Sequence, residues 1–429
     1  MEATNMTQET SWSEKLGMHP QLAIGYLGLL LFMIGDGVES GFLSPYMLDL
    51  HFSESKIALV FTFYGVAAAL AAWLSGVLSD LLGPKKVMWA GLIIWLVLEI
   101  PFLTLGLAQR NYPIILICYM IRGLGYPLFA FGFLVWVTAI TPHRYLATSV
   151  GWFWFARTGG LPTLGSLFAS YSVTRHGPYR TLWYSVAFVA LGGLIALLGI
   201  REPRGSRPLR TGNEHPFRIL LSGISIIWKL PKVGLGGIVA VITTTSEFGF
   251  LLFLPIFYIH TVGFTLAQWL QILTVMFATN IFFNLFWGWV GDKIGWRTVI
   301  TVVGACGCAA AALGLYYVPH IFGANYTYVM LAGMVYGATL AGFVPLGAIM
   351  ATLAPESRGA ALSVYNLGSG ISIWLGPAIA GIFLPRIGVG GVIWIFALMY
   401  LLAAVLSIFL KTSKPETTME IQGHAAVAH

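Results

Sequence analysis

The chain has 429 residues, of which 58% are apolar and only 9% are charged, and its mean hydropathy is +0.82. This composition leaves too little polar surface for a soluble protein of this length and predicts an all-α membrane protein. At about 20 residues for each spanning helix, the length accommodates about twelve spans. The net charge of +7 does not indicate a nucleic-acid partner, because the basic residues fall mainly in loops predicted on one side.

The apolar runs follow one another in two sets of six. Residues 1–19 are polar and lack an apolar core with a cleavage site, so we interpret them as a cytoplasmic tail. The charges, prolines and glycines of 201–232 predict a cytoplasmic linker between two six-helix halves, 20–200 and 233–410, and 411–429 forms the second cytoplasmic tail. The predicted spans are 20–48, 55–79, 86–107, 112–140, 146–171, 181–200, 233–259, 265–290, 297–318, 325–353, 359–385 and 389–410.

The distribution of Lys and Arg predicts the orientation in the membrane. With the amino terminus inside, 16 of the 23 lie in inner segments and five in outer ones, while Arg122 and Arg157 lie within spans. Basic residues concentrate in cytoplasmic loops, so both termini are predicted in the cytoplasm.

A charged loop motif occurs twice, 212 positions apart, between the second and third spans of each half. A glycine, an aspartate, a second glycine and a basic residue recur at the same offsets. The two copies predict that the halves are related repeats. Their residues are Gly76, Asp80, Gly83, Lys85 and Lys86 in the first copy, and Gly288, Asp292, Lys293, Gly295 and Arg297 in the second.

Two further matches extend the repeat. Glu39-Ser-Gly-Phe-Leu pairs with Glu247-Phe-Gly-Phe-Leu at an offset of 208, and the segment ending at Arg144 pairs with the one ending at Arg358 at 213 to 214. Two parallel halves imply a pseudo-two-fold axis along the membrane normal and a substrate cavity between them.

Ionisable side chains within spans are costly in lipid and therefore functional candidates. Asp36 and Arg122 are predicted at similar depth, and a carboxylate beside a cation can gain or lose a proton as a cavity opens, so we predict Asp36 as a proton site with Arg122 as its partner. The alternative is a structural ion pair between two helices. Glu99, just before Pro101, is interpreted as interfacial or structural.

A hydroxyl-rich ligand needs carboxylate, amide and indole groups at fixed positions. Asn280 and Asn284 lie four apart on one helix face, and the alternative is that each bonds across helices. Trp152 and Trp154 point in different directions, so at most one of them is expected to line the cavity. The predicted ligand set is Glu39, Trp152, Arg157, Glu247, Asn280, Asn284, Tyr365, Asn366 and Trp374.

Asp80 and Asp292 end spans on the inner side. Each could accept hydrogen bonds from the amino-terminal turn of the span that follows Arg358 or Arg144, respectively, while the cytoplasmic side is closed. This predicts a gating contact, and loop capping without dependence on the transport state is the alternative.

No cofactor or metal site is expected. The three cysteines and nine histidines are scattered, and neither paired catalytic acids nor a phosphate-binding loop is evident, so the sequence predicts a protein that is not an enzyme and is not driven by ATP.

The repeated loop motif resembles the signature of the major facilitator superfamily, although Leu81 stands where a basic residue is usual. Arg122-Gly-Leu-Gly125 resembles the arginine motif of the fourth helix in proton symporters of that superfamily, and Met334-Val-Tyr336-Gly337 shows no matching arginine in the second half. The first span, Gly25–Tyr46, is similar to that of the polyol permease group.

The resemblance implies a secondary transporter that imports ribitol or D-arabinitol by proton symport across the bacterial inner membrane, with alternating access. Protons, a polyol and the lipid bilayer are then its partners, and a monomer suffices because the two halves enclose the cavity. The alternatives are a uniporter or an exporter of another small polar solute. A membrane receptor would need a sensing domain, and none is evident.

Overall fold

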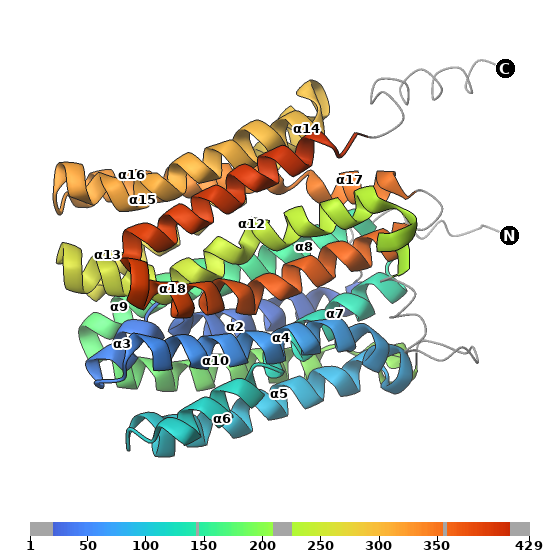
Figure 1. Cartoon of the computed structure of the whole chain (residues 1–429). Helices are drawn as coiled ribbons and strands as arrows, with labels where there is room; N and C mark the ends of the chain where they lie inside the picture. The colour runs from blue at the N-terminus through green and yellow to red at the C-terminus, as the bar shows by residue number, and fades with distance from the viewer. Residues whose placement is uncertain (1–19, 143–145, 209–224, 355–357, 412–429) are drawn as a thin grey trace, which may run out of the picture. The chain divides into compact units, whose positions relative to one another are not determined.

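The computed structural model describes residues 20–142, 146–208, 225–354 and 358–411, and these ranges are helical without strands. Ten helical segments within them are long and apolar enough to cross a membrane. Figure 1 shows the long helices with the short connections between them.

The chain divides into two compact units, Met1–Ser40 with Leu74–Gly212, and Gly41–Trp73 with Asn213–His429. The elements of the first unit are η1 (Pro20–Leu22), α2 (Ala23–Ser40), α5 (Pro84–Pro101), η2 (Phe102–Leu107), α6 (Tyr112–Arg122), α7 (Gly125–Ile140), α8 (Leu146–Thr158), η4 (Gly159–Leu164), α9 (Gly165–His176), α10 (Pro178–Gly199) and η5 (Pro203–Ser206). Helix α4 (Glu54–Leu82) contains the boundary between the units.

The second unit contains α3 (Leu43–Asp49), most of α4, α12 (Pro231–Ile256), η6 (Phe257–Val262), α13 (Leu266–Ile294), α14 (Trp296–Thr298), η7 (Val299–Gly307), α15 (Cys308–Phe322), α16 (Tyr326–Leu340), η8 (Ala341–Phe343), α17 (Leu346–Leu353) and α18 (Arg358–Ile408). Its first segment, which includes α3, packs on α12. The indole of Trp269 donates a hydrogen bond of 2.8 Å to the carbonyl of Gly41, and Ser44 donates one of 3.4 Å to Leu251.

The helices are consistent with the predicted twelve spans. Helix α18 has 51 residues and breaks at Gly388, whose φ is 66° and ψ −177°, so it covers the last two predicted spans. The predicted fifth span corresponds to α8, η4 and α9, which follow one another without a gap.

The backbone repeats between the halves at its left-handed residues. Among the described residues, eight have positive φ, and they form four pairs separated by 211 to 213 positions. Gly83 and Gly295 of the loop motif have nearly the same conformation, with φ of 91° and 96° and ψ of 138° and 127°. The other pairs are His51 with Gly263, Arg110 with Gly323, and Gly177 with Gly388. Each residue of a pair lies where a helix ends or breaks, at the corresponding place in its own half.

Glycines allow α2 to lie very close to its neighbours. A Cβ at Gly37 would lie 1.9 Å from the carbonyl oxygen of Leu161 in η4, and one at Gly28 would lie 2.6 Å from the backbone of Ala196 in α10. Figure 1 shows α2 beside α10. Because Asp36 and Glu39 lie on this same stretch of α2, the close packing fixes where their carboxyl groups point.

We expect Gly83→Ala to destabilise the protein. The positive φ favours glycine, and a Cβ at this position would lie 2.8 Å from the carbonyl oxygen of Arg207, so the change should cost roughly 1 to 3 kcal/mol. Gly76→Ala is the matched control, because a Cβ there meets no described atom within 4 Å. The thermal-unfolding midpoint of the purified protein in detergent should fall for the first variant only, and equal shifts for both would contradict the assignment.

The repeat also predicts stabilising changes. Arg110 has a φ of 54° and is exposed, whereas its partner in the second half is Gly323. Arg110→Gly should raise the unfolding midpoint by relieving a strain of about 1 kcal/mol. Arg110→Ala removes the same charge but keeps the strain, so it should give no such rise; a rise of equal size would show that loss of charge is responsible.

Candidate functional site

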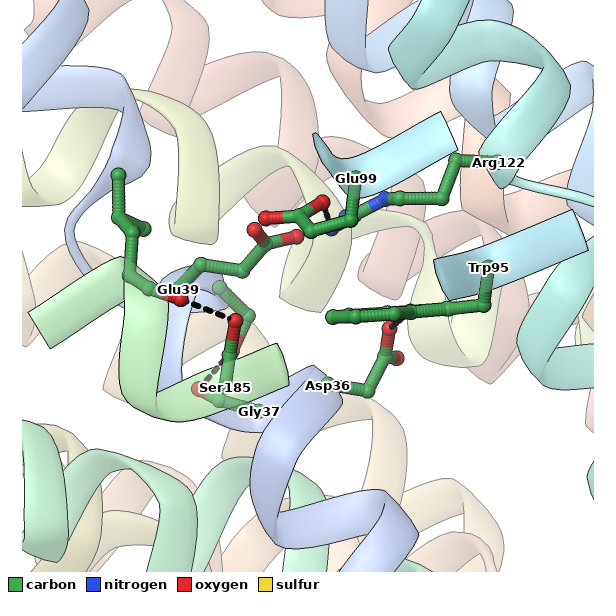
Figure 2. Close-up of polar contacts among 9 residues, drawn as sticks. Asp36, Gly37, Glu39, Trp95, Glu99, Arg122 and Ser185 are labelled. Atoms are coloured by element: carbon green, nitrogen blue, oxygen red, sulfur yellow. Dashed lines mark hydrogen bonds and ion pairs between the residues drawn. The ribbon is translucent and has the colours of Figure 1, made fainter. Parts of the chain in front are cut away.

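The first unit buries an arginine between two glutamates. Arg122 is the last residue of α6, and its side chain is fully buried. Its Nη1 pairs with Glu99 Oε2 from α5, and its Nη2 pairs with Glu39 Oε1 from α2 (Figure 2). Glu99 is 0% exposed, and Glu39 is 1% exposed. Three helices are therefore joined through one guanidinium group.

Aromatic rings enclose the same guanidinium. Its central carbon lies 4.5 Å from the ring centre of Tyr119, 4.9 Å from that of Trp95 and 5.7 Å from that of Phe102. The negative face of an aromatic ring attracts a cation, most strongly where water is excluded. The rings stabilise the charge of Arg122 and provide an apolar wall around the two glutamates.

Trp95 connects Asp36 to the cluster around Arg122. The indole Nε1 of Trp95 donates a hydrogen bond of 2.7 Å to Asp36 Oδ1, and Asp36 is 4% exposed. Figure 2 shows Asp36 and Arg122 on different sides of this indole. Asp36 and Arg122 interact electrostatically, but the direct ion pairs of Arg122 go to Glu39 and Glu99. The proton role of Asp36 remains a prediction.

The spacing of the sequence explains how two helices meet at this cluster. Asp36 and Glu39 are three apart on α2, and Trp95 and Glu99 are four apart on α5, so each pair shares a helix face. The two faces meet pairwise, Asp36 with Trp95 directly, and Glu39 with Glu99 through Arg122. Of the interfacial or structural roles expected for Glu99, the interfacial one is wrong, because its side chain is fully buried inside the first unit and pairs with Arg122.

Arg157 lies on α8, next to Trp154. Its guanidinium carbon is 5.4 Å from the ring centre of Trp154, and its Nε is buried without a hydrogen-bond partner among the described residues. Arg157 also attracts the carboxylate of Asp36 electrostatically. Trp152 is half-buried and packs edge-on against Phe155 at 5.5 Å, whereas Trp154 is exposed.

In the second unit, Glu247 from α12 borders a small hollow. The walls include Trp269, Met276 and Tyr336. The hydroxyl groups of Tyr336 and Tyr400 lie 2.9 Å apart, and Tyr400 donates to the carbonyl of Thr243 at 3.2 Å. A carboxylate beside a chain of phenols suits hydroxyl groups of a ligand better than it suits an anion.

One of the two asparagines of α13, Asn280, makes the cross-helix contact that was the alternative to ligand binding, whereas Asn284 bonds within its own helix. Asn280 donates from Nδ2 to the carbonyl of Gly337 in α16 at 3.1 Å, and Asn284 donates to Asn280 Oδ1 at 3.3 Å. Asn284 is half-buried, so its side chain remains the more accessible of the two. Ligand contact by either amide stays a prediction.

Tyr365, Asn366 and Trp374 all lie on α18 within the second unit. Tyr365 and Trp374 are half-buried and Asn366 is exposed. A Cβ at Gly65 would lie 2.7 Å from the Cα atom of Trp374, so α4 and α18 are in close contact there. Their predicted role in ligand binding stays a prediction.

The loop motifs contact their own halves. Lys85 donates from Nζ to the carbonyl of Ile200 at 3.5 Å, and Arg297 donates to the carbonyl of Ile408 at 3.4 Å. Asp292 accepts a bond of 2.7 Å from the Trp296 indole.

The remaining basic residues of the predicted gating set are only partly described. Lys293 lies 3.6 Å above the ring centre of Trp289, and Lys86 is exposed. Arg144 and the side chain of Arg358 lie outside the described residues, so the gating contacts of Asp80 and Asp292 stay predictions.

Sequence reasoning missed Trp95 and the pairing of Glu99 with Arg122. Two features of the sequence point to these residues. Glu99 is one of few acidic residues within spans, and Trp95 lies one helical turn before it on the same face.

In the described part of the chain, no group of three or more His, Cys, Asp or Glu comes together as a metal site.

Comparison with known proteins identifies close relatives. A Bacillus subtilis (strain 168) protein named alpha-ketoglutarate permease is 42% identical over 94% of this chain and 92% of its own. The D-arabinitol and ribitol transporters of Klebsiella pneumoniae are each 37% identical, over 93% and 94% of this chain and 94% and 95% of their own. These matches confirm the resemblance to polyol transporters.

Solved structures share the fold. A D-xylose-proton symporter superposes with a TM-score of 0.71 at 18% identity, covering 92% of this chain and 97% of its own. The nucleoside transporter NupG gives a TM-score of 0.73 at 17% identity, covering 92% and 99%. The family described as Major Facilitator Superfamily matches residues 25–340 and again 236–426. The chain therefore belongs to the major facilitator superfamily, and it is a multi-pass membrane transporter rather than an enzyme.

Proposed function

We propose that this protein imports a linear sugar alcohol, ribitol or D-arabinitol, by proton symport across the bacterial inner membrane. The observation that carries the proposal is the buried cluster of Glu39, Glu99 and Arg122, with Asp36 beside it. Buried acids next to a cation can bind and release protons as access alternates. The names of the two Klebsiella pneumoniae relatives support the polyol.

The two units contribute different chemistry to this mechanism. The first supplies the charged cluster, with Asp36 and Arg122 in proton coupling. The second supplies Glu247 and neutral hydroxyl groups, which fit a ligand rich in hydroxyls. In this scheme Glu39, Trp152 and Arg157 contact the polyol from the first half, while Glu247, Asn280, Asn284, Tyr365, Asn366 and Trp374 contact it from the second.

Movement of one half against the other alternates the access. Asp80 and Asp292 of the two loop motifs stabilise the state that is closed to the cytoplasm, with both termini on that side. The proposed cavity needs only the two halves of one chain, so a monomer is the proposed functional form.

An anionic substrate is the second candidate, because a relative at 42% identity is named alpha-ketoglutarate permease. The observation that favours it is Arg157, whose buried Nε has no hydrogen-bond partner among the described residues. A guanidinium with an unused buried donor is suited to a carboxylate ligand. Glu247 argues against a dianion, since a second carboxylate near the ligand repels it.

Uptake into proteoliposomes distinguishes these candidates. We expect radiolabelled ribitol or D-arabinitol to accumulate under an inward proton gradient, and the accumulation to collapse when an uncoupler is added. Accumulation of 2-oxoglutarate instead would establish the second candidate. Equilibration of a polyol without accumulation would identify a uniporter and remove proton coupling.

Arg157→Gln provides an independent test of substrate charge. Loss of a hydrogen bond to a charged group costs about 1.5 to 3 kcal/mol, so affinity for a carboxylate substrate should fall roughly 10- to 150-fold. Affinity for a polyol should fall far less, because only a neutral hydrogen bond is lost. Arg157→Lys keeps the charge and serves as the matched control. Equal losses for polyol and 2-oxoglutarate in the Gln variant would contradict a charge-specific role.

A further inference from the structure

An ion pair joins the ends of two helical segments in the second unit. Asp49 is the last residue of α3, and its Oδ1 lies 3.6 Å from Nε2 of His260 in η6. Both side chains are open to solvent, with 61% of Asp49 and 40% of His260 exposed. The pair lies at the end of α12 opposite the loop motif, because η6 continues α12 and α13 then runs back to Gly295. The predicted orientation places this end on the outer side of the membrane.

The two partners occupy corresponding positions in the two halves. They are 211 positions apart, and the left-handed pairs of the repeat are 211 to 213 positions apart. His51 and Gly263, which form one of those pairs, follow Asp49 and His260 closely in the chain. If a two-fold axis relates the halves, a residue can touch its own counterpart only close to that axis. The ion pair therefore marks the place where the outer ends of the first and seventh spans meet.

Neutral contacts continue from the ion pair along the same interface. Ser44 donates a hydrogen bond of 3.4 Å to the carbonyl of Leu251, and the Trp269 indole donates one of 2.8 Å to the carbonyl of Gly41. Neither bond contains a group that titrates near neutral pH. Helix α3 belongs by sequence to the first half, whereas Leu251 and Trp269 belong to the second. These contacts must therefore break if the outer ends of the two halves separate.

Few other ionisable side chains lie on the elements around η6. The outer ends of α12 and α13, residues 248–256 and 266–280, contain no charged residue and no histidine. On α15, the ring of His320 stacks on Phe257 at 5.8 Å, and its Nδ1 lies 2.7 Å from the carbonyl of Tyr316 in the same helix. The ionisable side chains on the neighbouring segments are Asp49 and His51 at the end of α3, Glu54 on α4, and Tyr316 and His320 on α15.

The attraction within this pair depends on pH near neutrality. Histidine side chains change charge between about pH 5 and 8, whereas aspartate side chains are ionised throughout that range. A protonated His260 attracts the carboxylate of Asp49, and the attraction is lost as the pH rises and the ring becomes neutral. Because the pair is exposed, its effect on an equilibrium is modest, roughly 1.5- to 5-fold.

We propose that Asp49 and His260 form an outer latch, which holds the outer ends of the first and seventh spans together when the outer solution is acidic. Protonation of His260 stabilises the state that is closed to the outside, and deprotonation makes outward opening easier. The latch responds to the outer pH without carrying a transported proton, and it is separate from the buried cluster around Arg122. The gating role rests on the proposed alternating access, whereas the pH-dependent contact does not.

Hydrogen–deuterium exchange of the purified full-length protein, followed by mass spectrometry, tests the contact without any substrate. After correction for the intrinsic pH dependence of amide exchange, peptides that cover α3 and η6 should exchange roughly 1.5- to 5-fold more slowly at about pH 5 than at about pH 8. Asp49→Asn and His260→Asn should each abolish this difference. His320→Asn is the matched control and should preserve it, because His320 bonds to a carbonyl of its own helix.

A charge exchange separates the latch from a general loss of structure. Asp49→His combined with His260→Asp places the same two groups on opposite sides, so the pH difference should return. A merely structural effect of the single changes would not be repaired in this way. A difference that persists in His260→Asn, disappears in His320→Asn or fails to return in the exchanged pair would overturn the proposal.

Solute counterflow in proteoliposomes then tests the gating role. Acidifying only the outer solution should slow counterflow of ribitol, D-arabinitol or 2-oxoglutarate more in the unmodified protein than in His260→Asn. Equal slowing in both proteins would remove the gating role. If the unmodified protein transports none of the three solutes, the proposed function fails while the amide-exchange result on α3 and η6 stands.

Discussion

The burial of one guanidinium group in an apolar bundle determines much of the first unit. A charge within the membrane needs partners that replace water, and Arg122 has two carboxylates and three aromatic rings around it. Those partners come from α2, α5 and α6, so the ion pairs also hold the three helices together. The close approach of α2 to η4 and α10 depends on glycine, since a Cβ at Gly37 or Gly28 would overlap the neighbouring backbone. The glycine contacts of α2 and the ion pairs of Arg122 therefore depend on the same positions of these helices.

Much of the fold could be predicted because a membrane leaves few choices. Apolar runs of about 20 residues become helices, since lipid offers no other partner for backbone groups. The repeated motif around Asp80 and Asp292 predicted two related halves, and the paired left-handed residues carry that repeat into the backbone. The division into compact units was not evident, because Gly41–Trp73 belongs by sequence to the first half but packs in the second unit, where Trp269 bonds to Gly41. The order of the sequence does not determine which helices this segment packs against, because that depends on tertiary contacts.

The sequence predicted which residues form the site better than it predicted which of them pair with each other. Counting residues along each helix predicted that Asp36 and Arg122 could meet, and the structure brings both of them to the cluster that contains Glu39. Depth does not determine the direction in which a side chain points, and the rotation of α5 brings Glu99 rather than Asp36 to the second nitrogen of Arg122. Trp95 then occupies the space between Asp36 and Arg122, and its indole satisfies the aspartate. The spacing of Trp95 and Glu99 on one face was visible in the sequence, but no rule connected it with an arginine on another helix.

The second unit has the same plan with different chemistry. Asn111 and Asn325 cap α6 and α16 at an offset of 214, and the same offset relates Arg122 to Tyr336. Glu39 corresponds to Glu247, so the carboxylate is kept while the guanidinium is replaced by a phenol that bonds to Tyr400. A phenol offers a hydrogen bond without a charge, and it therefore cannot hold a buried carboxylate ionised as an arginine does. Arg122 therefore pairs with buried carboxylates in the first unit, whereas Tyr336 and Tyr400 supply neutral hydrogen bonding at the corresponding place in the second.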